Sequence, residues 1–160
     1  MINVLFVCMG NICRSPSAEA VMNSIIHKNN LTEKIKCDSA GTISYHAGET
    51  ADERMIGHAS KRGYNLTSIA RKIQHMDLDH FDYIITMDDE NFHNVEALDV
   101  EGIYKNKISK MMKYSKKFNT AEVPDPYYGG PHGFEHVLDL LEDACEGLLE
   151  HIFKEHPEIK

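Results

Sequence analysis

The segment from residue 2 to residue 26 constrains the fold of this chain more than any other. Residues 2–7 are nearly all apolar and rich in branched side chains, which predicts a strand buried on both faces, central in a parallel sheet. Pro16 suits the first turn of a helix. The helix is predicted from apolar residues at helical spacing, which are Ala18, Val21, Met22, Ile25 and Ile26. A buried strand passing into an amphipathic helix is typical of an α/β fold.

Three further strands are predicted downstream. Ile35, Cys37 and Ser39 alternate with polar residues, as in a half-exposed strand. Residues 83–87 read as a third strand, and residues 107–109 give a weaker signal for a fourth.

Helices are predicted between these strands and after the last of them. The segment 50–53 has the form of a capping box with Thr50 as the cap, and Gly63 is a plausible stop for that helix. Asp88 can cap a helix that begins after the third strand. The final helix is predicted from a long apolar stripe made by Phe134, Val137, Leu138, Leu141, Cys145, Leu148 and Ile152.

Alternation of strands and helices predicts a three-layer α/β domain with a mostly parallel sheet. Residues 1–160 are expected to form one domain, because the chain has no linker-like tract and no internal repeat. Ligands bind such sheets beyond the carboxyl ends of the strands. Residues 8–15 therefore lie where a site is expected.

Charge and cysteine content narrow the function classes. The formal net charge of −8 argues against general affinity for nucleic acid or anionic lipid surfaces. The apolar start of the chain lacks a basic segment and is too short for a signal sequence or a membrane span. The 4 cysteines are irregularly spaced, which fits reduced thiols and a cytoplasmic location.

The segment from Cys8 to Pro16 joins the first strand to the first helix and has the strongest chemical signal. A short loop at a helix N-terminus can turn its backbone N–H groups inward and form an anion nest. Gly10 supplies conformational freedom to that loop, and Asn11 tolerates positive φ. Arg14 can close the ring by gripping two phosphate oxygens.

The same positive field favours a thiolate at Cys8, so one loop would both bind a phosphate and activate its attacker. Ser15 could hydrogen-bond the sulfur. A proton donor for the leaving oxygen is expected elsewhere in the chain. Asp125 is the candidate, because it lies in a Pro/Gly-rich loop before the last helix, and loops on rigid scaffolds often hold catalytic groups.

These segments resemble the low-molecular-weight protein tyrosine phosphatases. V-L-F-V-C-M-G-N-I-C-R-S-P at 4–16 is similar to the family's N-terminal signature, and D-P-Y-Y at 125–128 is similar to its acid loop. The resemblance continues through A-E-A at 18–20, D-S-A-G-T at 38–42, F-D-Y-I-I-T-M-D at 81–88 and the final helix.

The resemblance implies a flavodoxin-like fold with a four-stranded parallel sheet and a metal-free double displacement without a cofactor. Cys8 would be the nucleophile, Arg14 the phosphate clamp and Asp125 the general acid and base. Substrates would be phosphotyrosine proteins or small aryl phosphates, and inorganic phosphate would be the product. The sequence leaves the oligomeric state open, with a monomer favoured. The phosphate-binding loop would comprise Met9, Gly10, Asn11, Ile12, Cys13, Arg14 and Ser15.

The resemblance also implies supporting roles. Aromatic residues would wall the substrate crevice, namely Tyr45, Tyr127 and Tyr128, and hydrogen bonds among Asn11, Ser15 and Ser39 would hold the loop. Cys13 would trap Cys8 as a reversible disulfide under oxidation. Ser68 departs from the family, in which many members have histidine at that position, so the outer part of the loop support is in question.

Four alternatives stay open at this point. Arsenate reductases of the same fold use further cysteines, and here the later ones, Cys37 and Cys145, are expected to be packing residues. Protein arginine phosphatases are closer, but tend to have threonine at the position of Ile12. A non-catalytic binding module would be expected to lack one of the three reactive residues. A zinc site would start from His132 and His136, which have no third ligand nearby in the sequence.

Overall fold

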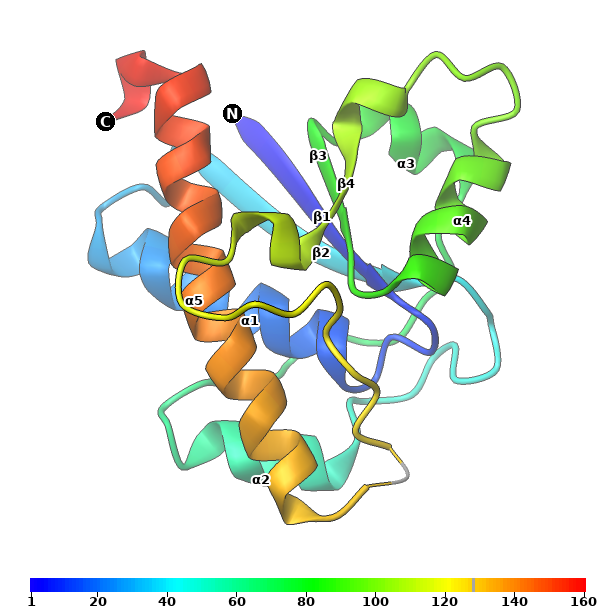
Figure 1. Ribbon diagram of the computed structural model, residues 1–160, viewed down its shortest axis with the longest axis vertical. Helices are drawn as coiled ribbons and strands as arrows, with labels where there is room; N and C mark the ends of the chain where they lie inside the picture. Colours follow the sequence, from blue (N-terminus) through cyan, green and yellow to red (C-terminus); the bar gives the residue numbers. More distant parts are fainter. Residues whose placement is uncertain (128) are drawn as a thin grey trace.

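The computed structural model describes residues 1–127 and 129–160, which form a four-stranded parallel sheet between two layers of helices (Figure 1). The strands lie in the order β2-β1-β3-β4. Their bounds are β1 Ile2–Cys8, β2 Ile35–Gly41, β3 Tyr83–Thr86 and β4 Ile108–Lys110. The predicted three-layer α/β fold is confirmed, and the third and fourth strands differ from prediction by one residue at their ends.

Strand β1 is central and buried on both faces, as its apolar run predicts. Val4 and Phe6 pack into the core on one face of the sheet, whereas Leu5 and Val7 pack into the core on the other. Both neighbouring strands pair with β1 in parallel. The end of β1 is therefore fixed from both sides, which sets the position of the loop that follows it.

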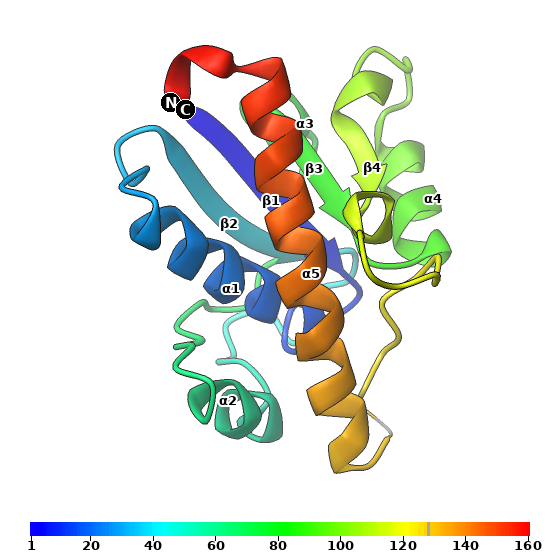
Figure 2. The same ribbon diagram turned by 60° about the vertical axis from the view of Figure 1, so that its left-hand side comes forward.

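Helices cover both faces of the sheet. Helices α1 (Arg14–Lys28) and α5 (Pro131–Glu155) cover one face, and α3 (His75–His80) and α4 (Asp89–Leu98) cover the other (Figure 2). Helix α2 (Glu53–Ser60) lies beyond the carboxyl edge of the sheet and packs on α5. Short 3-10 turns span Lys105–Lys107, Met111–Tyr114 and Pro157–Ile159. None of the helices formed by the described residues is long and apolar enough to cross a membrane.

The helix ends agree with prediction in part. Pro16 lies in the first turn of α1, and Asp88 caps α4 by accepting a hydrogen bond from the Asn91 N–H at 2.8 Å. The predicted cap at Thr50 is wrong. Asp52 caps α2 instead, because its carboxylate accepts from the backbone N–H groups of Arg54 and Met55. The helix ends at Ser60, so Gly63, with φ of 86°, lies in the turn beyond it.

The apolar stripe of the last helix is confirmed, since all of its seven predicted residues are buried. Helix α3 was not predicted. It has six residues, too few for a helical period to show, and its buried positions are Leu78 and the charged Asp77. Asp77 accepts a hydrogen bond from the Gln74 N–H in a capping box at the start of this helix, but the charge of a buried carboxylate also needs a partner from elsewhere in the chain.

The strand order reverses at β1, because the chain passes from β1 to β2 on one side and later enters β3 on the other. Loops after strands on either side of such a reversal separate and leave a crevice. The loop 9–13 starts at this point, at the carboxyl end of β1 (Figure 1).

Candidate active site

The loop 9–13 is termed the cradle below, and Asn11 and Gly10 contribute to its shape in different ways. Asn11 adopts φ of 57°, in the left-handed region as predicted. Gly10 does not have positive φ, so the expectation of special backbone freedom there is wrong. A Cβ on Gly10 would lie 3.0 Å from Cδ2 of His46, and the glycine therefore serves to let that side chain approach.

A glycine outside the cradle supports it at closer range. Gly41 ends β2 opposite Cys8, and a Cβ on it would lie 2.6 Å from the Met9 carbonyl oxygen and 3.1 Å from the Asn11 nitrogen. The cradle backbone thus rests directly on the β2 backbone. Sequence reasoning missed this role, although Gly41 lies at the carboxyl end of a strand that neighbours β1.

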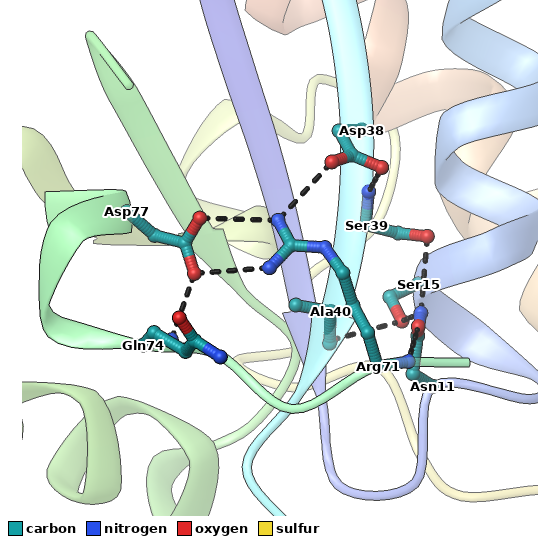
Figure 3. A network of polar contacts seen from close by, with 8 residues as sticks. All are labelled: Asn11, Ser15, Asp38, Ser39, Ala40, Arg71, Gln74 and Asp77. Atoms are coloured by element: carbon teal, nitrogen blue, oxygen red, sulfur yellow. Dashed lines mark hydrogen bonds and ion pairs between the residues drawn. The ribbon is translucent and has the colours of Figure 1, made fainter. Parts of the chain in front are cut away.

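Cys8 is the last residue of β1 and is 2% exposed. Its Sγ lies 3.0 Å from Ser15 Oγ, as the sequence suggested. Behind the cradle, Asn11 Nδ2 donates to Ser15 Oγ at 2.8 Å and to Ser39 Oγ at 3.0 Å (Figure 3). The structure therefore brings together the three residues expected to support the loop.

Arg14 begins α1 and is 3% exposed. Its Nη1 donates to Asp88 at 2.6 Å and to the Val123 carbonyl at 3.1 Å, and its Nη2 lies 3.6 Å from Asp125 Oδ2. Burial alone would lower the pKa of Arg14, but Cys8, Asp88 and Asp125 together raise it. The guanidinium is consequently a permanent cation beside the thiol.

Asp88 was predicted only as a helix cap. One of its carboxylate oxygens does cap α4, while the other accepts from Arg14. An acidic residue just past the carboxyl end of a strand adjacent to β1 was the available sequence signal for the second role.

Cys13 precedes α1 and is 4% exposed. Burial, followed by the charge of Asp52, raises the pKa of the Cys13 thiol, and the charge of Cys8 acts in the same direction. Cys13 is therefore a neutral thiol within electrostatic range of Cys8.

A cavity of about 320 Å³ lies above the cradle. Both Tyr45 and Tyr127 contribute to it, as expected, whereas Tyr128 lies outside the described residues. Sequence reasoning missed Ile43 and His46, which follow β2 at the same edge of the sheet. The cavity is lined by Cys8, Met9, Gly10, Ile12, Cys13, Arg14, Ile43, Tyr45, His46, Asp125 and Tyr127.

The crevice walls are held by local contacts. The His46 ring meets the Tyr45 ring edge-on at 4.8 Å, and its Nδ1 lies 2.6 Å from Glu49 Oε2. The Tyr127 ring lies 6.3 Å from the His46 ring, and the guanidinium of Arg54 lies over the Tyr127 ring at 5.2 Å. Two aromatic rings flanking a deep polar end suit a flat aryl group.

Asp125 reaches the cavity from a loop anchored to the sheet. The Val123 N–H donates to the Met87 carbonyl at 2.8 Å, and the Tyr127 N–H donates to Asp125 Oδ1 at 3.0 Å. The side chain of Asp125 remains 35% exposed. The carboxylate thus lies beside the guanidinium, in the cavity that Cys8 also lines, while water and substrate can still reach it.

Residues weighed for other chemistries lie elsewhere. Cys37 in β2 and Cys145 in α5 pack with the core and are not among the described residues that line the cavity. Within residues 1–127 and 129–160, no group of three or more His, Cys, Asp or Glu side chains is placed to hold a metal ion. The Ser68 Oγ is buried and has no hydrogen-bond partner in the part of the chain that the structure describes.

A thiol, a buried guanidinium and a carboxylate around a cradle at a strand-to-helix turn are typical of a phosphate-processing hydrolase site. Comparison with known proteins agrees. A family model described as low molecular weight phosphotyrosine protein phosphatase matches residues 3–158. The chain therefore belongs to the low molecular weight phosphotyrosine protein phosphatase family.

Individual relatives cover the same length. A Synechocystis protein that bears the low molecular weight protein-tyrosine-phosphatase name is 52% identical, covering 95% of this chain and 97% of its own. The solved structure of a protein tyrosine phosphatase from Entamoeba histolytica matches with a TM-score of 0.92 and 50% identity, covering 99% of both chains. The structure of a Drosophila arginine phosphatase matches with a TM-score of 0.86 and 31% identity, covering 93% and 96%.

Proposed function

We propose that this enzyme hydrolyses phosphotyrosine and small aryl phosphates through a phosphocysteine intermediate. The observation that supports this most strongly is the convergence of Cys8, Arg14 and Asp125, from three separate parts of the chain, on one cavity. In the first step the Cys8 sulfur attacks phosphorus and the P–O bond to the aryl group breaks. Asp125 in its acid form gives its proton to the departing oxygen.

In the second step water attacks the phosphocysteine. Asp125, now a carboxylate, takes a proton from that water, the S–P bond breaks, and inorganic phosphate leaves with the Cys8 thiolate restored. Arg14 and the cradle N–H groups stabilise the charge on the phosphoryl oxygens in both steps. Both steps use groups of this chain and require no cofactor.

Phosphoarginine is the second candidate substrate, because an arginine phosphatase is among the similar structures. The cavity favours the aryl substrate, since Ile12, Tyr45 and Tyr127 give it apolar and aromatic walls. A planar phenol ring packs well against such walls, whereas a charged guanidino group would lose hydration there, and the Asp125 carboxylate that lines the cavity already pairs with Arg14.

The test compares wild type, Cys8→Ser and Asp125→Ala on p-nitrophenyl phosphate and on a phosphotyrosine peptide, with EDTA present. Wild type is expected to turn over both, and Cys8→Ser neither. Asp125→Ala should lose about 10²–10⁴-fold on the peptide but clearly less on p-nitrophenyl phosphate, because that leaving group needs little protonation. A phosphoarginine peptide and arsenate are assayed in parallel.

Turnover that EDTA abolishes or that survives in Cys8→Ser would contradict the mechanism. Equal losses of Asp125→Ala on both aryl substrates would remove Asp125 from the acid role. A higher kcat/KM on the phosphoarginine peptide than on the phosphotyrosine peptide would show that phosphoarginine is the better substrate and would support the second candidate.

We also infer that Cys13 protects Cys8 from irreversible oxidation. Peroxide would convert the Cys8 thiolate to a sulfenic acid, and the Cys13 thiol would then displace water to form a disulfide. After a peroxide pulse, dithiothreitol is expected to restore activity to wild type but not to Cys13→Ser. Cys145→Ser is the matched control, since Cys145 is buried away from the cavity and should recover like wild type. Full recovery of Cys13→Ser would exclude the role.

A further inference from the structure

The orientation of one buried amide determines the hydrogen bonding of Cys8. Asn11 is 1% exposed, and its Nδ2 uses both hydrogens, one on Ser15 and one on Ser39. Its Oδ1 accepts from the backbone N–H of Arg71 at 3.1 Å. A reversed amide would place N–H against N–H at that contact, so the Arg71 N–H fixes which way the Asn11 amide faces.

The consequence reaches the sulfur through Ser15. A hydroxyl has one hydrogen, and because Ser15 Oγ accepts from Asn11, that hydrogen is left to point elsewhere. Cys8 Sγ lies 3.0 Å away, whereas the Ala40 carbonyl, at 3.4 Å, is more distant. The favoured arrangement therefore has Ser15 donating to Cys8, which stabilises a thiolate more than a thiol.

The Arg71 side chain holds its own backbone in place. Its guanidinium donates to Asp77 at 3.0 and 3.2 Å and to Asp38 at 3.1 Å, so it bridges helix α3 and strand β2 (Figure 3). Asp77 is 7% exposed and also accepts from the Gln74 N–H at 2.7 Å. The Arg71 carbonyl accepts from the Gly41 N–H at 2.8 Å. The buried charge in α3 thus has its partner in this network.

We propose that Arg71 is a positioning residue for the cradle, which it serves by fixing the Asn11 amide and, through it, the hydrogen bond from Ser15 to Cys8. This inference rests on the proposed function. Ser68, whose hydroxyl meets no hydrogen-bond partner among the described residues, cannot share the task. Arg71 therefore provides the outer support of the cradle, for which the resemblance leads to an expectation of histidine at the position of Ser68.

The experiment compares Arg71→Met and Arg71→Lys with Arg62→Met. Arg62 is the matched control, because it follows the end of α2 and pairs with three carboxylates of α5, namely Glu135, Asp139 and Glu142. No hydrogen bond or ion pair joins it to the cradle among the described residues. Both methionine variants lose an ion network, but only one of these networks reaches Asn11.

Two quantities are measured for each variant: kcat and KM on p-nitrophenyl phosphate, and the inorganic phosphate concentration that half-protects Cys8 from iodoacetate, with Cys8→Ser as the blank. Arg71→Met is expected to lose about a hundredfold in kcat/KM and to need about tenfold more phosphate, because small displacements of reacting groups are costly. Arg62→Met should match wild type in both. Arg71→Lys should recover part of the loss, since an ammonium cannot serve both carboxylates as a guanidinium fork does.

Equal values for Arg71→Met and Arg62→Met would overturn the inference, as would an Arg71→Lys variant no better than Arg71→Met. If Arg71→Met does not fold, Asp77→Asn decides, and wild-type phosphate protection in that variant would count against the proposal. Failure of the proposed function looks different: wild type itself would show neither turnover nor phosphate protection, and the inference would fall with it.

Discussion

Replacing Gly41 with alanine is expected to lower kcat/KM on p-nitrophenyl phosphate by about a hundredfold, although Gly41 touches no substrate. The new Cβ would lie 2.6 Å from the Met9 carbonyl oxygen, closer than such atoms can approach. The position of a Cβ is fixed by its own backbone, and the Met9 oxygen is itself a backbone atom, so no side-chain rotation relieves the contact. Either the cradle or the end of β2 must shift, and the backbone N–H groups of the cradle would then move away from the positions that the proposed phosphate site requires.

Gly10→Ala is the comparison, because the nearest atoms to its Cβ would belong to side chains, with His46 Cδ2 at 3.0 Å and Ile12 Cγ1 at 3.8 Å. A side chain can turn away, so the loss in kcat/KM is expected to be several-fold smaller than for Gly41→Ala. Thermal unfolding of both variants is followed to separate altered geometry from unfolding. A Gly41→Ala enzyme with wild-type kcat/KM, or one less impaired than Gly10→Ala, would contradict the close-approach argument.

Replacing Gly147 with alanine is expected to destabilise the chain by about 3 kcal/mol, against the usual preference of helices for alanine. Gly147 lies in α5, and its Cβ would fall 1.8 Å from the Tyr114 carbonyl oxygen and 2.9 Å from its carbon. Because these are backbone atoms of the Met111–Tyr114 turn, α5 would have to move away from that turn. The free energy of unfolding is measured by urea denaturation.

Gly57→Ala provides a control of opposite sign. Gly57 lies in α2, and apart from its chain neighbours and the backbone of its own helix no described atom comes within 4 Å of its Cβ position. The substitution should therefore stabilise by about 0.5–1 kcal/mol, as expected when glycine is removed from a helix interior. If Gly147→Ala stabilised the chain as Gly57→Ala is expected to do, the close contact between α5 and the Tyr114 backbone would be contradicted.

The sequence allowed the sheet, the long helices and most of the cavity lining to be predicted. Strand β1 and helix α5 can be predicted from their own segments of sequence, because one is an apolar run and the other has a long apolar stripe. The cradle residues are consecutive, so their chemistry is readable as a unit. Asp125 was found because Pro and Gly mark its loop as a turn.

The parts that were missed depend on contacts between distant segments. Helix α3 is stabilised by Arg71 meeting Asp77, and no periodicity announces an ion pair. His46 follows a strand with no pattern around it, and its place in the crevice depends on β2 lying beside β1. The Gly41 requirement arises from two backbones in contact. Such contacts can be predicted only once the order of the strands in the sheet is known.

The two roles of Asp88 have a consequence for how this enzyme can change. One oxygen caps the N-terminus of α4 and the other pairs with Arg14, so a single side chain serves both helix stability and the proposed phosphate site. Asparagine would retain a capping oxygen but leave a buried cation without its charge partner. At this position, stability and activity are expected to fall together rather than trade against each other, and neither property can be tuned there alone.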